Sequence, residues 1–406
     1  MNGSRTRMLA TTAVVAVLVG TTALTGAQAS ASGPAATPVA APAKPTPIDT
    51  GRTMSAADRS AIDAAAQQFV ASAPDGTPGL WLAVWDPKRG YYEQAYGSAV
   101  VGGAKATTRD HFLIGSVTKT VFATAVLEQV AAGTLALTDT VRELDPALAR
   151  KYPVAARKTV AQLLGMTSRI PDYADPAVGK MFANPQQAFT RDQLIALGIA
   201  EGKPIPAPGG YSTTNYLILG KIMTTLTGKT PERLVNSVFR QARMGNSRLE
   251  TGNVTMPEPR AHGYIGEIYG AQAAEVNPSL SATTDTADWT MMWGKEGGGA
   301  YSTIGDLAKW GGTCLGTSLL PADVAAERLQ TTAIDAGNYG LGIIRQGGWL
   351  AHSGQAIGYT ANVACNPRTG AVVAYALNST EGPFGLDAAL GPVAWPAYST
   401  AQSARS

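Results

Sequence analysis

The sequence has little of several features that would point directly to a function. Only 15% of the 406 residues are charged, the formal net charge is +3, and histidine occurs three times. Such a chain offers no basic surface for a nucleic acid or an anionic membrane. It also has no H-E-x-x-H, no Cys and His cluster at zinc-site spacing, no phosphate-binding glycine loop and no G-x-S-x-G. We therefore expect no metal, no cofactor and no nucleic-acid partner, and neither a nucleotide-binding nor an α/β-hydrolase fold.

A long, largely apolar run occurs only near the N-terminus. Residues 8–24 form this run, Arg5 and Arg7 precede it, and Ala27-Gln28-Ala29 follows. This is the order of a secretory signal peptide, so we expect residues 1–29 to be removed near Ala29 and the protein to be secreted. The run is short for a membrane span and no lipidation cysteine follows it, which predicts no membrane anchor.

Composition divides the rest of the chain. Residues 30–54 are rich in alanine and proline, a composition typical of an extended linker. Residues 55–398 are long enough for one large domain with a substantial core, and residues 399–406 form a short tail. Charge gives no indication of a partner or an oligomeric state.

Cysteine is almost absent, with only Cys314 and Cys365. In a secreted chain the oxidising environment favours pairing, so we predict one disulfide between them. Two buried free thiols are the alternative.

Periodicity predicts strands at both ends of the domain and helices between them. A capped helix over 55–72 precedes strands over 79–85 and 91–96, and strands over 349–352, 359–364 and 371–377 come near the end. Segments at helical spacing, separated by Pro and Gly loops, fill about residues 117–310. The economical arrangement is α+β: one antiparallel sheet built from both termini, with the mostly helical lobe inserted and a cleft between them.

Ser116 and Lys119 are the first chemical candidates. They stand three residues apart where an apolar stretch gives way to a helical pattern, and so share one helix face. A serine hydroxyl is a poor nucleophile at neutral pH, but an amine kept neutral by burial can take its proton. The helix around Lys119 is apolar nearly all round, which favours this role over the alternative of a capping serine and a solvated lysine.

Tyr211 and His352 are the second and third candidates. Tyr211 follows a Pro-Gly-Gly turn just before a helical segment, from which it can point into a cleft and share a proton with Lys119. His352 ends a predicted strand, and Gly354 lets a substrate backbone lie along that strand's edge. The backbone N–H groups of Ser116 and Gln355 can then form an oxyanion hole. The alternatives are a tyrosine packed against a helix start and a hydrogen-bonded histidine at a strand end.

Ser-x-x-Lys, then Tyr-Ser-Thr, then His-Ser-Gly, in this order, make the chain resemble the serine β-lactamase and penicillin-binding protein superfamily. The branch it is most similar to holds class C β-lactamases, secreted D-alanyl-D-alanine carboxypeptidases, D-aminopeptidases and esterases. Supporting segments are Leu163-Leu164-Gly165-Met166-Thr167-Ser168, similar to the family's LLTHTSG stretch, and Gly298-Gly299-Ala300-Tyr301-Ser302-Thr303. The resemblance covers the chain from about Ser55 onward and implies the β-lactamase/transpeptidase-like fold.

The resemblance also implies roles for single residues. Ser116 becomes the acyl-forming nucleophile, Lys119 and Tyr211 the proton-transfer pair, and His352 a group that assists this pair. Four residues are implied to contact substrate: Thr213, Ser353, Gly354 and Arg345.

Two departures from the family pattern bear on the substrate. Thr213 stands where the family usually has Asn, so a hydroxyl replaces a carboxamide, and Asn215 is expected to face elsewhere. His352 replaces the lysine of β-lactamases, which favours peptidase or esterase branches.

We therefore predict a D-alanyl-D-alanine carboxypeptidase that acts on peptidoglycan stem peptides and is acylated by β-lactams. An esterase, a class C-type β-lactamase or a D-aminopeptidase on the same fold is the enzyme alternative. A non-catalytic protein that binds penicillin or peptidoglycan is the alternative from another class.

Overall fold

The computed structural model describes residues 48–72, 78–250, 252, 255–291, 293–380 and 384–396. The predicted signal peptide, most of the predicted linker and the tail from residue 399 lie outside these residues. Residues 48–54 already contact the domain: the Tyr91 N–H donates to the Arg52 carbonyl and Met54 is buried. Ordered contacts therefore begin before Ser55.

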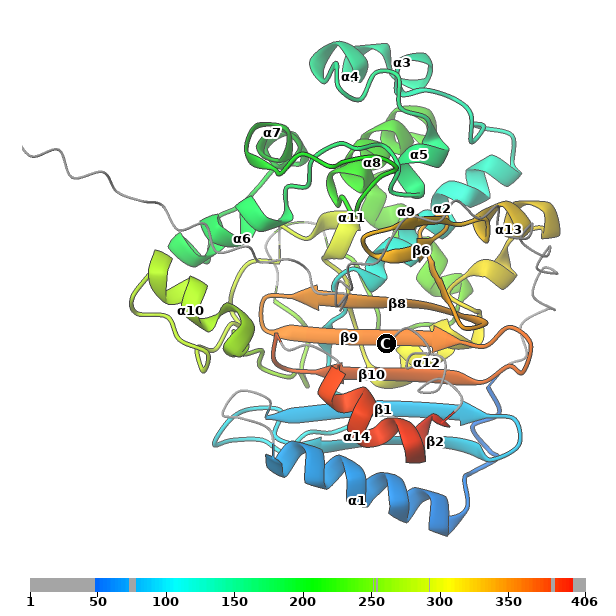
Figure 1. Cartoon of the computed structure of the whole chain (residues 1–406). Helices are drawn as coiled ribbons and strands as arrows, with labels where there is room; N and C mark the ends of the chain where they lie inside the picture. The colour runs from blue at the N-terminus through cyan, green and yellow to red at the C-terminus, as the bar shows by residue number, and fades with distance from the viewer. Residues whose placement is uncertain are drawn as a thin grey trace, which may run out of the picture.

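The fold is α+β, as the sequence predicts (Figure 1). Its main sheet has eight strands in the order β2-β1-β10-β9-β8-β7-β6-β5, and every neighbouring pair is antiparallel. The strands of this sheet are β1 (Gly79–Asp86), β2 (Gly90–Gly97), β5 (Thr332–Ile334), β6 (Gly337–Tyr339), β7 (Ile344–Gln346), β8 (Trp349–Ala356), β9 (Tyr359–Cys365) and β10 (Val372–Leu377). A second, two-stranded sheet pairs β3 (Phe112–Leu113) with β4 (Tyr301–Ser302).

The two ends of the domain meet in the sheet, one strand in from its β2 edge. Strand β1 pairs with β10 over its length, with Leu80 opposite Leu377 and Trp85 opposite Val372. All residues of β1 except Asp86 are buried, because both faces of the strand are covered. This pairing confirms the predicted sheet built from both termini.

The described helices lie mostly between β3 and β5, and most of them form a lobe above the β8 side of the sheet (Figure 1). Their bounds are α1 (Ala56–Ser72), α2 (Val117–Ala131), α3 (Val141–Leu144), α4 (Pro146–Lys151), α5 (Val160–Leu164), α6 (Ala174–Ala183), α7 (Arg191–Glu201), α8 (Thr214–Thr227), α9 (Pro231–Gln241), α10 (Gly266–Val276), α11 (Lys295–Gly298), α12 (Ile304–Gly312), α13 (Ala322–Arg328) and α14 (Phe384–Ala394), with a 3-10 turn η1 (Thr317–Leu319).

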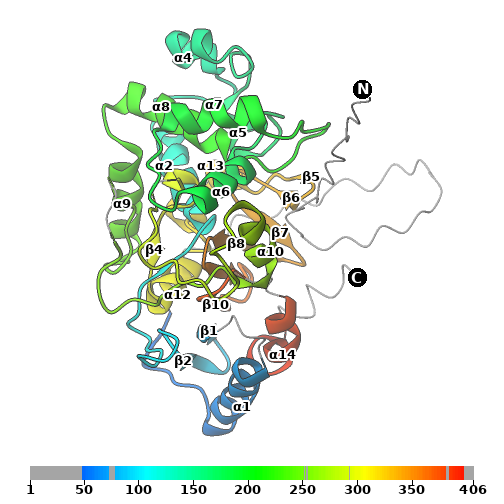
Figure 2. The same ribbon diagram turned by 90° about the vertical axis from the view of Figure 1, so that its left-hand side faces the viewer.

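Each face of the sheet carries its own apolar layer. On one face α1 and α14 lie side by side and cover Leu80, Leu82 and Val84 of β1 (Figure 2). On the other face Trp81 and Ala83 join the larger core that includes α2 and α12. The alternation along β1 is the period of two that a strand requires.

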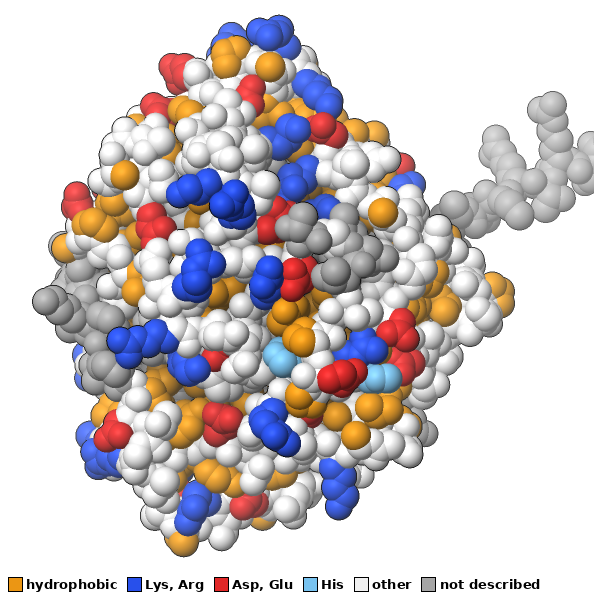
Figure 3. All heavy atoms as spheres, turned by 180° about the vertical axis from the view of Figure 1, so that it is seen from behind, with side chains coloured by type: hydrophobic (Ala, Val, Ile, Leu, Met, Phe, Trp, Pro, Cys, Tyr) orange, Lys and Arg blue, Asp and Glu red, His pale blue; other side chains and the backbone are white. Residues whose placement is uncertain are grey.

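The predicted disulfide is present. Cys314 follows α12, Cys365 ends β9, and their Cα atoms are 5.3 Å apart. In the described part of the chain, none of the helices is both long enough and apolar enough to cross a membrane. On the face shown in Figure 3, acidic and basic side chains are interspersed, in keeping with the weak net charge.

Candidate active site

Ser116 lies at the start of α2, where the chain turns sharply from β3 into the helix. The turn is made by Gly115, whose φ is +49°, a conformation that costs residues with a Cβ. A Cβ at this position would also lie 2.5 Å from the backbone nitrogen of Gln355. Glycine is therefore required for the nucleophile's helix to approach strand β8 this closely.

Lys119 lies one turn further along α2 and is fully buried. Its Nζ lies 2.9 Å from the Oγ of Ser116 and 2.7 Å from the carbonyl oxygen of Gly297, to which it donates. Burial lowers the pKa of this amine to about 7, although the nearby carboxylate of Asp172 opposes the change. A large fraction of Lys119 is thus neutral at physiological pH and can accept the Ser116 proton.

Tyr211 faces the same two groups from the turn before α8. The Nζ of Lys119 lies 4.8 Å from the centre of the Tyr211 ring. Its phenol oxygen is buried and makes no hydrogen bond in the described part of the chain. Burial raises the pKa of this phenol, and the nearby Ser116 hydroxyl opposes the rise. An unpaired buried hydroxyl costs about 1–3 kcal/mol, so it is a group held ready for a further partner.

His352 is brought to the site by β8, but neither ring nitrogen is directed at Lys119. Nδ1 lies 2.6 Å from the carbonyl oxygen of Ser353, so Nδ1 carries a proton and donates it. Nε2 lies 2.9 Å from the hydroxyl of Tyr339, which must then donate to it. Burial lowers the pKa of His352 to about 3, and the imidazole stays neutral at any working pH.

Tyr339 is a site residue that the sequence analysis missed. It ends the three-residue strand β6 and its ring packs edge-on against both Tyr211 and His352. A strand this short gives almost no periodic signal, and the only local hint was a tyrosine before Gly340-Leu341-Gly342.

The proposed oxyanion-hole groups lie at the closest approach of α2 and β8. A Cβ on Gly354 would lie 2.0 Å from the Ile114 carbonyl oxygen and 2.9 Å from the backbone nitrogen of Ser116. Ser116 stands at a helix N-terminus, where the first N–H groups have no intrahelical acceptor. The next residue after Gly354 is Gln355, so the two backbone N–H groups lie in adjacent segments.

Thr213 and Asn215 follow Tyr211 and face different surroundings. The Thr213 N–H donates to Oδ1 of Asp172 over 2.9 Å, and its hydroxyl lies 3.4 Å from Oδ2. Asn215 is buried and accepts a hydrogen bond from Ser168 over 2.6 Å. As expected, Asn215 does not replace the missing Asn at position 213.

Ser353 and Arg345 are the other two residues that the resemblance implies to contact substrate. Ser353 is exposed and, by strand alternation, points to the face opposite that of His352. The Arg345 guanidinium donates to the Leu329 carbonyl over 2.9 Å, near the end of α13. A substrate contact by either residue stays a prediction.

A buried ion-pair network supports the segment that holds the Lys119 acceptor. Arg191 contacts Glu296 with its Nε at 2.9 and 3.0 Å, and Glu232 with its Nη2 at 2.6 Å. Glu296 is fully buried and immediately precedes Gly297. Because breaking a buried pair is costly, this network fixes the Gly297 carbonyl against Lys119.

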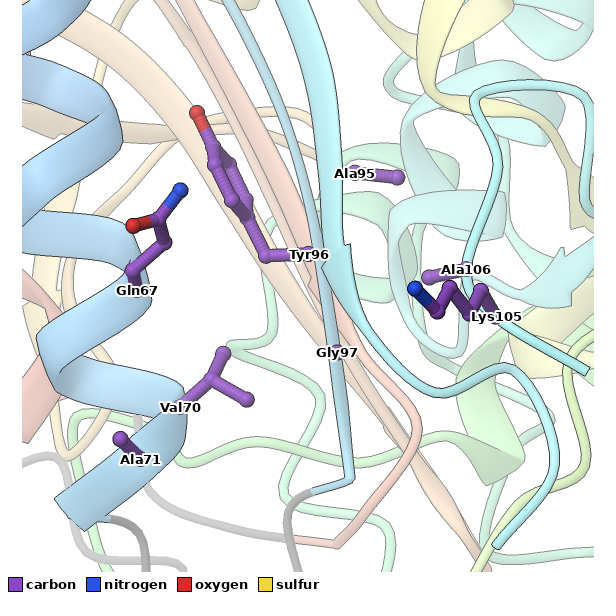
Figure 4. Close-up of a pocket in the computed structure, with 8 residues that line it drawn as sticks. All are labelled: Gln67, Val70, Ala71, Ala95, Tyr96, Gly97, Lys105 and Ala106. Carbon is purple, nitrogen blue, oxygen red and sulfur yellow. The ribbon is translucent and has the colours of Figure 1, made fainter. Parts of the chain in front are cut away.

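The described residues outside this cluster form no second catalytic site. Within the described residues, no group of three His, Cys, Asp or Glu side chains gathers at metal-binding distance. A hollow of about 360 Å³ lies between α1 and β2, lined among others by Gln67, Tyr96 and Lys105 (Figure 4). It has no nucleophile and base pair, and α1 covers the sheet face opposite that of α2.

The chain also matches a known protein family. The family model described as Beta-lactamase matches residues 62–391. The chain belongs to the beta-lactamase family. The matched range begins within α1 and ends within α14, so it spans both sheet faces and the helical lobe.

Solved structures share this fold. A D-stereospecific amidohydrolase from Streptomyces sp. is 24% identical with a TM-score of 0.68, and the match covers 81% of this chain and 97% of that one. A D-amino acid amidase from Ochrobactrum anthropi SV3 is 23% identical with a TM-score of 0.69, covering 86% and 100%. An octameric penicillin-binding protein homologue from Pyrococcus abyssi is 22% identical with a TM-score of 0.67, covering 86% and 77%. These similarities establish a common architecture, and with the family match they make this chain a serine hydrolase of the β-lactamase and penicillin-binding protein fold.

Proposed function

We propose that the protein hydrolyses amide bonds of D-amino acid residues through an acyl-enzyme on Ser116. The observation that carries this proposal is the 2.9 Å contact between the Nζ of Lys119 and the Oγ of Ser116. Burial lowers the pKa of this amine to about 7, so that a large fraction of it is uncharged. Neutral Lys119 takes the hydroxyl proton, and the Ser116 oxygen attacks the substrate carbonyl.

The remaining groups support the later steps. The oxyanion forms near the backbone N–H groups of Ser116 and Gln355. The leaving amine takes a proton from the Lys119 and Tyr211 pair, and the bond between the carbonyl carbon and nitrogen breaks. Water, deprotonated by the same pair, then attacks the acyl carbon. The bond from this carbon to the Ser116 oxygen breaks, that oxygen takes the proton back from the pair, and the acid leaves. His352 stays neutral and holds Tyr339 beside Tyr211.

The sequence-based prediction, a D-alanyl-D-alanine carboxypeptidase, needs a group that binds the substrate's terminal carboxylate. His352 is a neutral imidazole engaged at both nitrogens, and Arg345 donates to the Leu329 carbonyl. The neutral imidazole has no charge to pair with a carboxylate, and the hydrogen bond of Arg345 runs to the end of α13 and not towards Ser116 or Lys119. An amidase or aminopeptidase acting on D-amino acids, one of the alternatives from the sequence, is therefore the form of the proposal that the geometry supports best.

We also propose that the protein is secreted. The disulfide between Cys314 and Cys365 is compatible with an oxidising compartment, and the leader-like residues 1–29 support secretion.

A substrate panel followed by intact mass spectrometry tests this proposal. The purified protein is incubated with D-alaninamide, with a peptide ending in D-alanyl-D-alanine, and with benzylpenicillin. Ammonia release from D-alaninamide supports the amidase. D-Alanine release together with a long-lived penicillin adduct would instead support the carboxypeptidase, and an adduct that disappears as penicillin is consumed would support a β-lactamase. No turnover and no adduct with any of the three would contradict the proposal and favour a binding protein.

A further inference from the structure

Asp172 is an acidic residue of the site to which the sequence analysis gave no role. It lies in the loop between α5 and α6 and is partly exposed. Its Oδ1 accepts hydrogen bonds from the backbone N–H groups of Thr213, at 2.9 Å, and Ala174, at 3.2 Å. Its Oδ2 lies 3.4 Å from the Thr213 hydroxyl. The carboxylate is thus held in a fixed orientation, with one oxygen used by the backbone and the other only weakly engaged.

Thr213 links Asp172 to the catalytic groups. Its Cγ2 lies so close to Gly297 that a Cβ there would be 2.4 Å away, and the Gly297 carbonyl accepts from Lys119. The Asp172 carboxylate also opposes the lowering of the Lys119 pKa by burial. The carboxylate therefore lies within electrostatic range of the nucleophile and its base.

A second carboxylate contacts the backbone of Tyr211. Oδ1 of Asp335, in the exposed turn between β5 and β6, accepts the Tyr211 N–H over 3.0 Å. Asp172 and Asp335 both act on the Tyr211 phenol as negative charges. A substrate group that enters beside Tyr211 therefore meets the negative charge of two acidic side chains.

The negative charge of Asp172 beside Thr213 differs from the neutral carboxamide that the family usually has at position 213. Family members usually have Asn where this chain has Thr213, and an Asn amide binds a neutral substrate amide. Here a hydroxyl and a carboxylate occupy the same region. A carboxylate paired with a nearby cation makes the stronger, charge-assisted type of hydrogen bond, whereas a substrate carboxylate placed there would be repelled.

We propose that Asp172, held in place by Thr213, binds the α-ammonium group of the substrate and makes the enzyme select D-amino acid amides and peptides with a free amino terminus. The inference rests on the proposed function of Ser116 and names the substrate class of that same site. The ammonium group is bound without being transformed, so the bond changes at Ser116 are those given above.

Equilibrium binding to a Ser116→Ala protein tests the inference without requiring turnover. The two ligands are D-phenylalanine amide, which has the ammonium group, and N-acetyl-D-phenylalanine amide, which lacks it, and titration calorimetry measures both. We expect the Ser116→Ala protein to bind the ammonium ligand about tenfold or more tightly than the acetylated one, the size of one charge-assisted hydrogen bond. Equal affinities, tighter binding of the acetylated ligand, or no binding of either would overturn the inference.

Asp172→Asn in the same background is the decisive variant. Asn keeps an Oδ1 acceptor for the Thr213 and Ala174 N–H groups and removes only the charge, so the loop is expected to fold. The ammonium ligand should lose about tenfold in affinity, whereas the acetylated ligand should change less than about twofold. Equal losses for both ligands would assign Asp172 a purely structural role and overturn the inference.

Two further variants control for charge and folding. Asp175→Asn removes the same charge three residues away, from a side chain that is 47% exposed and paired with Lys203 on the surface, and should leave both affinities unchanged. Asp172→Glu keeps the charge and should retain the preference for the ammonium ligand. Failure of the proposed function is measured separately: the protein that retains Ser116 would then carry no D-alanyl group on this serine after incubation with a D-alanyl p-nitrophenyl ester.

Discussion

The hydroxyl of Tyr339 lies 2.9 Å from the Nε2 of His352. Since Nδ1 of the same ring must donate to the Ser353 carbonyl, Tyr339 is the donor and the imidazole is neutral. His352, the residue that stands in place of the β-lactamase lysine, is therefore buried and has a hydrogen-bond partner at each ring nitrogen. In the proposed mechanism, proton transfer to and from Ser116 is therefore carried out by Lys119 and Tyr211.

Replacing Tyr339 tests this hydrogen bond. Tyr339→Phe removes the donor and leaves the buried Nε2 of His352 without a partner, which we expect to lower the free energy of unfolding by about 1–3 kcal/mol. Urea denaturation followed by tryptophan fluorescence measures the change. An unchanged free energy of unfolding would show that the contact does not satisfy His352 as described.

The pH dependence of acylation tests the role of Lys119. Its pKa is lowered to about 7, and only the neutral amine can accept the Ser116 proton. The acylation rate should therefore rise as pH increases through about 7 and then level off. Stopped-flow measurement of p-nitrophenol release from a D-alanyl p-nitrophenyl ester gives this profile.

Two variants identify the group behind that profile. Lys119→Arg, which cannot deprotonate, should lose at least about a hundredfold in rate. His352→Asn should keep the same rise near pH 7, because the pKa of His352 lies at about 3 in the folded protein. Loss of the rise in the histidine variant would transfer the base role to His352.

A methyl group at Gly354 tests the close approach of β8 to the nucleophile. The added Cβ of Gly354→Ala would meet the Ile114 carbonyl oxygen at 2.0 Å, so the strand must move away from Ser116. A displacement of about 1 Å at a reacting group costs about a hundredfold in kcat/KM. Gly179→Ala, in α6 with no atom within 4 Å of the new Cβ, is the matched control and should keep full activity. Comparable activity of the two variants would contradict the described geometry.

The disulfide is expected to contribute substantially to stability. Cys314 and Cys365 are 51 residues apart, and the chain-entropy model gives about 4 kcal/mol for a loop of this length. The Cys314→Ser/Cys365→Ser protein should lose about this amount in guanidinium unfolding, with an unchanged content of helix and strand by circular dichroism. A loss below about 1 kcal/mol would mean that the loop is restrained by other contacts.

Much of the fold could be predicted from local patterns, because its central elements are long and regular. Strands β1 and β10 are almost continuous apolar runs, β9 is buried along its whole length, and α2 is apolar nearly all round. Strands β5 to β7 have three residues each, which is too short for a periodic signal. Helix α3, not predicted here, carried a readable signal: the capping box of Thr140 and Glu143.

Local sequence patterns indicate some residues of the candidate site and not others. Ser116 and Tyr211 were candidates because each stands where one local pattern gives way to another, and Lys119 because it is a charge in an apolar helix one turn from Ser116. Asp172 and Tyr339 could not, because their roles arise from contacts between segments distant in sequence: Asp172 with Thr213, and Tyr339 with His352. Single residues in a loop or a short strand carry no information about such partners.

The central claim is that Ser116 becomes acylated, and peptide mapping after brief exposure to the D-alanyl p-nitrophenyl ester tests it most directly. The protein is quenched in acid, digested and analysed by mass spectrometry, beside Ser116→Ala and, as a control, Ser60→Ala on the exposed surface of α1. We predict a D-alanyl group on the peptide that contains Ser116 in the unmodified and Ser60→Ala proteins, and none in Ser116→Ala. An acyl group that persists in Ser116→Ala, or ester hydrolysis at an unchanged rate in that variant, would contradict the account.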